Sequence, residues 1–374
     1  MKTKSALILF LFIAFAFASG SAQTKKDDLI RIKIDAGQFK SSGNVSDYLE
    51  VVKLIPLETT KECLIGDIDK VVQYRNNIYV FDSKTYKLLW FDSSGKFLGQ
   101  IGQRGKGPGE YIEVSDFEVD TIRGLIYLPD FHKVHVFSAT GKWIKSVSTD
   151  FIANSMSITG DHEFIFYGAG RDDKMIKTDA NFKVMHSFFP WSPAYRLAPF
   201  YPLASYAGRN IFHIPFCDTL YTFDGVKPDP LIYMDFCGMN FTKRDFDRLA
   251  KNEQENLHEY LLASSKYVTC RGFLPVKQQA FFFLSTSNKA YWGLYNLATN
   301  QYSFVALPKL VNDIYGSYSY FHPIGITRDE FIFSATPDKL IQDKTSSFYK
   351  KYSKVLDGLT ELSNPVLLLA KSKI

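Results

Sequence analysis

A glycine-rich segment, residues 99–111, holds the main candidates for ligand contact in this sequence. It has Gly105, Gly107 and Gly109 at alternate positions, and glycine permits unusual backbone angles and close approach of a ligand. Four of its side chains offer charge or an aromatic ring: Arg104, Lys106, Glu110 and Tyr111. We expect these side chains to contact a ligand at one mouth of a channel. The alternative is a structural turn between two repeats, and the residues alone leave both interpretations open.

His132, which follows the glycine-rich segment in the sequence, adds a group that could titrate close to neutral pH. His132 follows Asp130 by two residues, whereas the preceding repeat has Lys84 two residues after Asp82. The repeated Asp indicates a structural role, because it can accept backbone hydrogen bonds and fix the turn. His132 is not repeated, so it is a candidate for ligand binding, for a general base or for a metal ligand.

A metal site would need histidines from several repeats, because the chain has no closely spaced ligand motif. His132, His213 and His322 would converge on a metal only if the repeats placed them around one channel mouth. The four cysteines are far apart and form no Cys-x-x-Cys pair: Cys63, Cys217, Cys237 and Cys270. We therefore expect no metal, no other cofactor and free thiols, with Cys217 and Cys237 as the pair to test for a disulfide.

Several aromatic side chains admit a role in stacking on a carbohydrate: Trp90, Trp143, Trp191, Trp292 and Tyr318. Trp191 lies in a loop between two prolines, which makes it the surface candidate for ligand binding. Trp90 and Trp143 occupy repeat positions, where packing between repeats is the expected role.

The sequence contains none of the strong catalytic motifs. It lacks His-Glu-x-x-His, Gly-x-Ser-x-Gly, a phosphate-binding glycine loop and a calcium loop of alternating acids. A site assembled from residues far apart in the chain would leave no such motif. Whether the protein is an enzyme is therefore left open.

An internal repeat predicts the elements that would position these residues. Residues 77–98 and 125–144 share one pattern of strand, turn, strand, tight Gly-bearing turn and strand. Four weaker copies of this repeat unit follow in the sequence. Two segments, about 242–264 and 346–360, have helical spacing instead, and Thr242 with Asp245 predicts a capping box. We expect the strand after Pro365, or the early segment 51–55, to pair across the termini and close the ring.

The repeat also carries a resemblance to a known family. The glycine-rich segment, the strand pair that follows and the Gly-bearing hairpin resemble the NHL-repeat signature. The whole chain is similar to the six-bladed β-propeller proteins that Bacteroidetes export. The resemblance implies an all-β fold of four-stranded blades with two helical insertions, in a single domain over residues 23–374.

The first 22 residues predict a signal peptide. Lys2 and Lys4 precede the apolar run 6–18, which is too short to span a membrane, and the small residues 20–22 form a cleavage site before Gln23. No cysteine follows the cleavage site closely, so lipid attachment is not expected. We expect a periplasmic or extracellular monomer without a stable membrane span. The net charge is +5, and the basic residues are scattered along the sequence instead of clustered. We therefore expect no binding of nucleic acid.

Three functions are compatible with these features. The first is a binding module that recognises a glycan, peptide or protein partner through channel-mouth loops. The second is a lyase or hydrolase that acts on an exported glycan or peptide, with its site at one end of the channel. The third is a scaffold of an envelope complex, with the helical insertions as docking elements.

Overall fold

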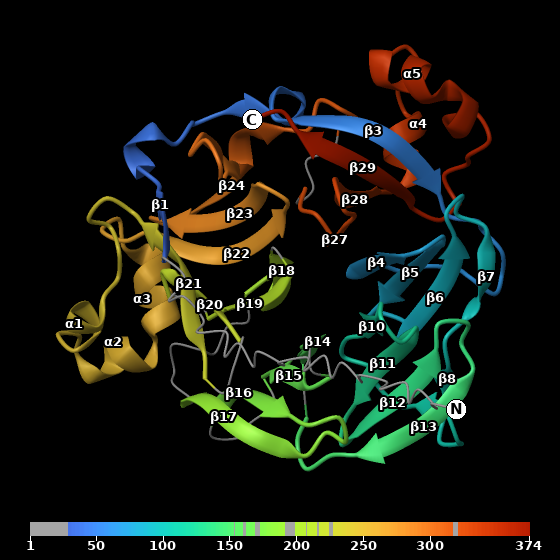
Figure 1. Cartoon of the computed structure of the whole chain (residues 1–374). Coiled ribbons are helices and arrows are strands. Elements are labelled where there is room, and N and C mark those ends of the chain that lie inside the picture. Colours follow the sequence, from blue (N-terminus) through green and yellow to red (C-terminus); the bar gives the residue numbers. More distant parts are fainter. Residues whose placement is uncertain are drawn as a thin grey trace, which may run out of the picture.

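The computed structural model of the chain describes residues 29–152, 154–159, 162–168, 173–190, 199–206, 208–214, 217–223, 227–316 and 321–374. The predicted signal peptide, Trp191 and Tyr318 lie outside these ranges. Antiparallel sheets stand around a central axis in the manner of propeller blades (Figure 1). The fold is therefore all-β and of the propeller type, and the innermost strand of each sheet faces this axis.

Four sheets follow one another in chain order. The first two contain β10 (Glu118–Asp120), β11 (Leu125–Asp130), β12 (Lys133–Ser138) and β13 (Trp143–Ser148), and then β14 (Ser155–Ile158), β15 (Phe164–Tyr167), β16 (Asp173–Thr178) and β17 (Val184–Pro190). The next two contain β18 (Leu203–Tyr206), β19 (Arg209–His213), β20 (Thr219–Thr222) and β21 (Asp229–Asp235), and then β22 (Thr269–Val276), β23 (Gln279–Thr286), β24 (Lys289–Asn296) and β25 (Tyr302–Ala306).

An eight-stranded sheet joins the two ends of the chain. Its order is β3 (Leu49–Pro56), β29 (Val366–Ser372), β28 (Phe331–Ala335), β27 (Gly325–Ile326), β4 (Lys70–Tyr74), β5 (Asn77–Asp82), β6 (Lys87–Asp92) and β7 (Phe97–Gln100). The two halves of this sheet meet where β27 and β4 pair in parallel over only two residues. Two short parallel pairs lie outside the large sheets: β2 (Gly43–Asn44) with β26 (Leu310–Val311), and β8 (Gln103–Arg104) with β9 (Glu110–Tyr111).

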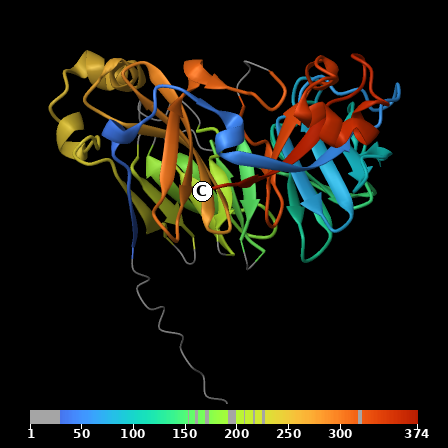
Figure 2. The same cartoon turned by 90° about the horizontal axis from the view of Figure 1, so that it is seen from above.

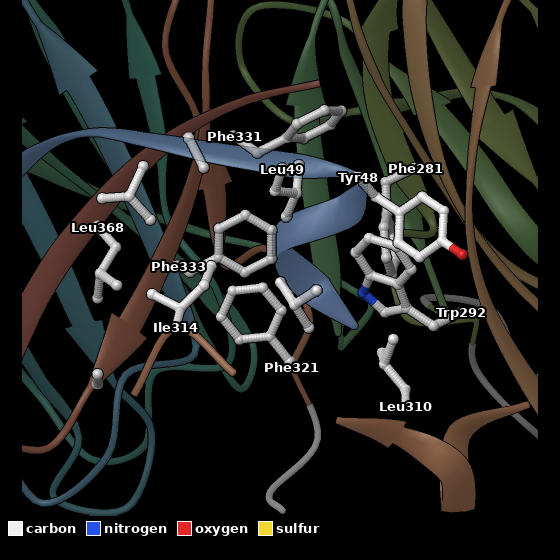
Figure 3. Packing of buried hydrophobic residues seen from close by; sticks show 14 of the residues in the cluster. Tyr48, Leu49, Phe281, Trp292, Leu310, Ile314, Phe321, Phe331, Phe333 and Leu368 are labelled. Atoms are coloured by element: carbon white, nitrogen blue, oxygen red, sulfur yellow. The ribbon is translucent and has the colours of Figure 1, made fainter. Parts of the chain in front are cut away.

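The expected closure across the termini is confirmed. β29 pairs antiparallel with β3, from Val366 opposite Pro56 to Ser372 opposite Leu49. Side chains of β3, β28 and β29 share a core with the neighbouring sheet (Figure 3), in which the rings of Phe321 and Phe333 stack with centroids 4.1 Å apart. This core holds both chain ends in one sheet, with β3 as its outer strand.

The N-terminal segment does more than the sequence predicted. β1 (Ile30–Lys33) adds to β21 in parallel as a fifth, outer strand, and the chain then bridges Lys40 to Val305 before it reaches β3. Two short 3₁₀ turns lie on this path, Ala36–Gln38 and Val45–Asp47, and a third, Leu307–Lys309, directly follows β25. The segment therefore ties the β18–β21 sheet, the β22–β25 sheet and the eight-stranded sheet together.

The hairpin turns have the backbone that the repeat predicted. Gly95 and Gly141 occupy matching turns with φ of +91° and +81°. A Cβ at Gly95 would lie 2.0 Å from the carbonyl oxygen of Pro56, so glycine is required there for space as well as for backbone angle. Asp82 and Asp130 end β5 and β11 and accept backbone N–H groups, as expected.

Helices occupy both segments where helical spacing was found. α1 (Lys243–Phe246), α2 (Lys251–Glu255) and α3 (Leu257–Ala263) form the first insertion, and the Thr242 and Asp245 capping box is present. The second contains α5 (Ser347–Leu356), with the additional short α4 (Pro337–Ile341) just before it. Both groups lie toward the same side of the ring, here called the helix-bearing face (Figure 2). Among the described residues, none of the helices has the length and apolar run that a membrane crossing needs.

Candidate functional site

A cavity of about 1180 Å³ occupies the centre of the ring, and we call it the channel cavity. Residues of the innermost strands β4, β10, β14, β18 and β27 line it, together with the segments that lead into them. These strands converge on one axis in Figure 1. Because neighbouring innermost strands come from distant parts of the sequence, the lining combines residues that no local motif could reveal.

One polar wall of the channel cavity is a compact ion cluster. The Lys70 ammonium lies 2.9 Å from Asp116 Oδ1 and 3.3 Å from Glu118 Oε2, and it also donates to the Phe117 carbonyl at 2.6 Å. The other oxygen of Asp116 accepts the Met156 N–H at 2.9 Å. The cluster therefore links β4, β10 and β14 around the axis.

Burial and charge act in opposite directions in this cluster. Burial lowers the pKa of Lys70, but the carboxylates of Asp116 and Glu118 outweigh that effect and raise it above the ordinary lysine value. Burial raises the pKa of Glu118, Lys70 opposes this shift and the negative charge of Asp116 adds to it. The wall thus presents a firmly charged ammonium beside a carboxyl group that takes up a proton more readily than an exposed glutamate.

A second cavity of about 520 Å³, here called the side pocket, shares Phe200 and His322 with the channel cavity. Its other lining residues come from α3 and the β22–β24 sheet: Leu262, Arg271, Phe283, Ser285, Asn288, Lys289 and Ala290. The Phe200 ring lies 4.7 Å from Phe283 and 5.8 Å from His322, measured between centroids. Phe200 is 44% exposed, so an aromatic surface remains available where the two cavities meet.

A β-bulge places Arg271 in the side pocket. The register of β22 against β23 shifts between Cys270 and Gly272, which leaves Arg271 as the extra residue. Bulges re-aim side chains in this way and are common beside binding sites. The Arg271 carbonyl accepts the Phe200 N–H at 2.9 Å, which holds the segment before β18 against this strand.

The insertion forms a fixed wall of the side pocket. The Ser287 N–H, in the turn between β23 and β24, donates to the Ser264 carbonyl just after α3 at 3.0 Å. Leu262 of α3 is itself a lining residue. The side pocket therefore belongs to the helix-bearing face, and α3 helps to shape it.

The residues predicted from the glycine-rich segment lie elsewhere. Arg104 is exposed, with its guanidinium 5.3 Å from the centre of the Tyr86 ring, and Lys106 is exposed as well. Glu110 accepts the Gln103 side chain and the Gly107 N–H, both at 2.7 Å. Tyr111 is fully buried, and burial raises its pKa to about 12. None of these predicted side chains is among the lining residues of either cavity, and ligand binding by them stays a prediction.

The candidate histidines do not come together. His132 is exposed and outside both cavity linings, His213 is buried, and His322 lines both cavities. Burial lowers the pKa of His213 to about 4, and the nearby positive charge of Arg271 adds to this shift. Within the part of the chain that the structure describes, no group of three His, Cys, Asp or Glu side chains could hold a metal ion. The four cysteines are free.

The tryptophans also separate into different environments. Trp292 is fully buried, so it cannot stack on a sugar, whereas Trp143 is 40% exposed instead of lying in the core. Trp90 is partly buried. The exposed aromatic ring at the cavities is Phe200, which the sequence did not single out, because a phenylalanine before an ordinary strand carries no distinguishing pattern.

A Ser-His-Asp arrangement exists away from the cavities. His135 contacts Ser146 Oγ at 2.8 Å through Nδ1 and Asp130 Oδ2 at 3.3 Å through Nε2. The Trp143 indole N–H donates to the same Ser146 oxygen at 3.1 Å. His135 is buried, and Asp130 also accepts two backbone N–H groups. These contacts link β11, β12 and β13, so the arrangement serves to hold the sheet together.

Known structures share the architecture of this chain. A protein described as exported, from Bacteroides fragilis NCTC 9343, is 22% identical with a TM-score of 0.76, and the alignment covers 92% of this chain and 100% of that one. A member of the DUF4221 family from Bacteroides vulgatus ATCC 8482 is 10% identical with a TM-score of 0.54, covering 87% of this chain and 99% of that one. At these identities the likeness concerns the fold alone. No curated protein matches the sequence.

The family is settled by a sequence profile that spans nearly all of the described chain. The profile described as a domain of unknown function, DUF4934, matches residues 29–371. It therefore includes β1 at one end and most of β29 at the other, as well as both cavities. The chain belongs to the DUF4934 family.

Proposed function

We propose that this protein is an exported six-bladed β-propeller that binds a glycan at the helix-bearing face. The blade count takes the eight-stranded sheet as two four-stranded blades that meet at the short β27–β4 pairing, in addition to the other four sheets. Export is supported by the predicted signal peptide over residues 1–22. The ligand would enter the channel cavity beside Phe200.

The observation that carries this proposal is the junction of the two cavities at Phe200. An exposed aromatic ring there offers an apolar platform, while the Lys70 cluster and the Ser285 and Asn288 side chains offer polar partners nearby. Pockets that combine an aromatic surface with a few directed polar groups are typical of small-ligand sites. A sugar has one apolar ring face and many hydroxyl groups, and it matches both features.

The test is a binding screen of the purified protein against acidic and neutral oligosaccharides of three to six units. Any binder is then titrated by calorimetry against the wild type and Phe200→Ala. Loss of a central aromatic contact costs about 1.4 kcal/mol, which weakens the affinity about tenfold. Phe131→Ala is the matched control, because Phe131 is 45% exposed and lies outside both linings.

One result would contradict glycan binding, and another would contradict the site proposed for it. If no oligosaccharide binds while peptides of similar length do, the ligand is a peptide. If Phe131→Ala weakens sugar binding as much as Phe200→Ala does, the ligand does not use the junction of the cavities.

The carboxyl groups of Asp116 and Glu118 favour one alternative, a lyase or hydrolase that acts on the bound glycan. Glu118 lines the channel cavity, and burial raises its pKa, which makes it a better proton donor than an exposed glutamate. Turnover would appear as new reducing ends in the presence of a bound oligosaccharide. It should be lost in Glu118→Gln and kept in Glu113→Gln, since Glu113 is exposed and outside both linings. Binding without turnover in the wild type would leave the binding module as the function.

A further inference from the structure

Arg271 carries a positive charge for which the described part of the chain supplies no counter-charge. Its guanidinium makes no hydrogen bond or ion pair with any described residue, although burial lowers its pKa below the ordinary value. Placing an unpaired charge in a partly buried position costs free energy. Such a cost is common where the missing partner is a ligand, because binding sites hold groups that are satisfied only in the complex.

The surroundings of Arg271 add positive charge rather than cancelling it. Lys289 lines the same side pocket, and no Asp or Glu is among the described residues that line it. The channel cavity next to it differs, because there Lys70 is already matched by Asp116 and Glu118. The side pocket therefore favours an anionic group, and the planar guanidinium favours a carboxylate held by two parallel hydrogen bonds.

The backbone near Arg271 argues against a peptide as the source of that carboxylate. β22 is an edge strand of its sheet, and extended peptides bind at such edges through backbone hydrogen bonds. At Arg271 this option is closed, because the Phe200 N–H already occupies the Arg271 carbonyl. What remains open is a pocket with hydroxyl and amide side chains beside the Phe200 ring, which suits a compact polyhydroxylated ring.

We infer that the side pocket is a subsite for a carboxylated sugar, a hexuronate unit of the glycan, and that Arg271 binds its carboxylate. This inference rests on the proposed glycan binding and specifies the class of sugar. The exposed Phe200 ring would contact the apolar face of the same or the adjacent unit. The other sugar units of the bound glycan would extend into the channel cavity, because the two cavities share Phe200 and His322.

The experiment compares a trigalacturonate with its carboxyl-reduced, neutral counterpart by calorimetry on the purified protein. The wild type should bind the acidic form at least about tenfold more tightly, since a charge-assisted hydrogen-bond pair contributes roughly 1.5–3 kcal/mol. Arg271→Gln should remove this preference while the neutral sugar binds as before, and Arg271→Lys should restore part of it. Arg31→Gln is the control, because Arg31 is an exposed guanidinium on β1, outside both linings. Circular dichroism confirms that each variant is folded.

The outcomes separate this inference from the proposal on which it rests. If the two sugars bind equally well, or if Arg271→Gln weakens both by the same factor, the subsite is wrong and glycan binding stands. If neither sugar nor the wider oligosaccharide panel binds, glycan binding fails and the subsite fails with it. An Asp-rich tetrapeptide that competes with trigalacturonate and depends on Arg271 would assign the carboxylate to a peptide and overturn the sugar assignment.

Discussion

The glycine-rich segment and the side pocket both contain basic side chains and an aromatic ring. They differ in whether the described chain supplies partners for the charged groups. In the segment, Glu110 is held by Gln103 and Gly107, and the Arg104 guanidinium lies against the Tyr86 ring. In the side pocket, Arg271 and Lys289 face a cavity without a carboxylate among its described lining residues. The contacts of Arg104 and Glu110 stabilise the folded segment, whereas a charge without a counter-charge in a cavity indicates a ligand site.

The largest expected effect on stability comes from the Lys70 ion cluster of the channel cavity. There, unlike at Arg271, the buried charges are paired with one another. Lys70→Met should lower the free energy of unfolding by about 2–4 kcal/mol near pH 8, since two carboxylates are left together without their cation. Chemical denaturation of the wild type and the variant measures this difference. Lys70→Arg, which keeps the charge, is the control.

The same variant should show a pH dependence with a definite sign. Glu118 has a raised pKa in the folded protein, so its contribution to stability is fully present below its unfolded pKa and is lost as pH rises through the folded value. Without Lys70 this pKa rises further. The stability difference between Lys70→Met and the wild type should therefore be smaller at pH 4 than at pH 8. An equal or larger difference at pH 4 would show that lost packing, not charge, is responsible.

A substitution in the glycine-rich segment should give the next largest effect, on stability but not on ligand binding. Gly109 has φ of +76°, and a Cβ there would lie 2.7 Å from the Trp143 ring. Gly109→Ala should therefore lower the free energy of unfolding by about 1–3 kcal/mol. Gly238→Ala is a matched control, because its φ is +87°, nothing lies within 4 Å of the added Cβ and it is outside both linings. A loss of sugar affinity in folded Gly109→Ala would show that the segment takes part in binding.

The smallest expected change in stability comes from replacing Arg271 or Arg104, and it directly compares an arginine in the side pocket with one in the glycine-rich segment. Arg271→Gln should leave the free energy of unfolding unchanged or raise it by up to about 1 kcal/mol, because it removes a charge that has no partner in the described chain. Arg104→Gln should instead lower it by about 0.5 kcal/mol, through loss of the contact with Tyr86. Thermal unfolding of both variants shows whether the free energy of unfolding changes in opposite directions. If Arg271→Gln is clearly destabilising, the guanidinium has a structural partner and its role as a ligand contact is weakened.

Much of the fold was predictable, because its signals are local. The first strands of the predicted repeat units 77–98 and 125–144 coincide with β5 and β11, and Gly95 and Gly141 have the positive φ that their turns require. The Thr242 cap also follows from a short pattern of residue types, and the closure by β29 and β3 was expected because an antiparallel all-β fold must hide its edges. The parallel addition of β1 to β21 was not predictable, since no local pattern specifies which distant edge a strand will join.

The candidate site was much less predictable than the fold. Phe200, Arg271 and His322 come from three segments that are each about 50 or more residues apart in the sequence, and Arg271 reaches the side pocket only through a bulge. A bulge depends on the pairing partner as well as on the bulged strand, so β22 alone does not reveal it.

By itself, the sequence determined the repeat, the turns and the two helical insertions, because each depends on residues close together in the chain. Only the tertiary structure decided which charges are paired. Glu110 finds its partners within seven residues, whereas Lys70 finds Asp116 across two sheets. Arg271 faces a cavity instead, and whether a charge is matched depends on every segment that packs around it.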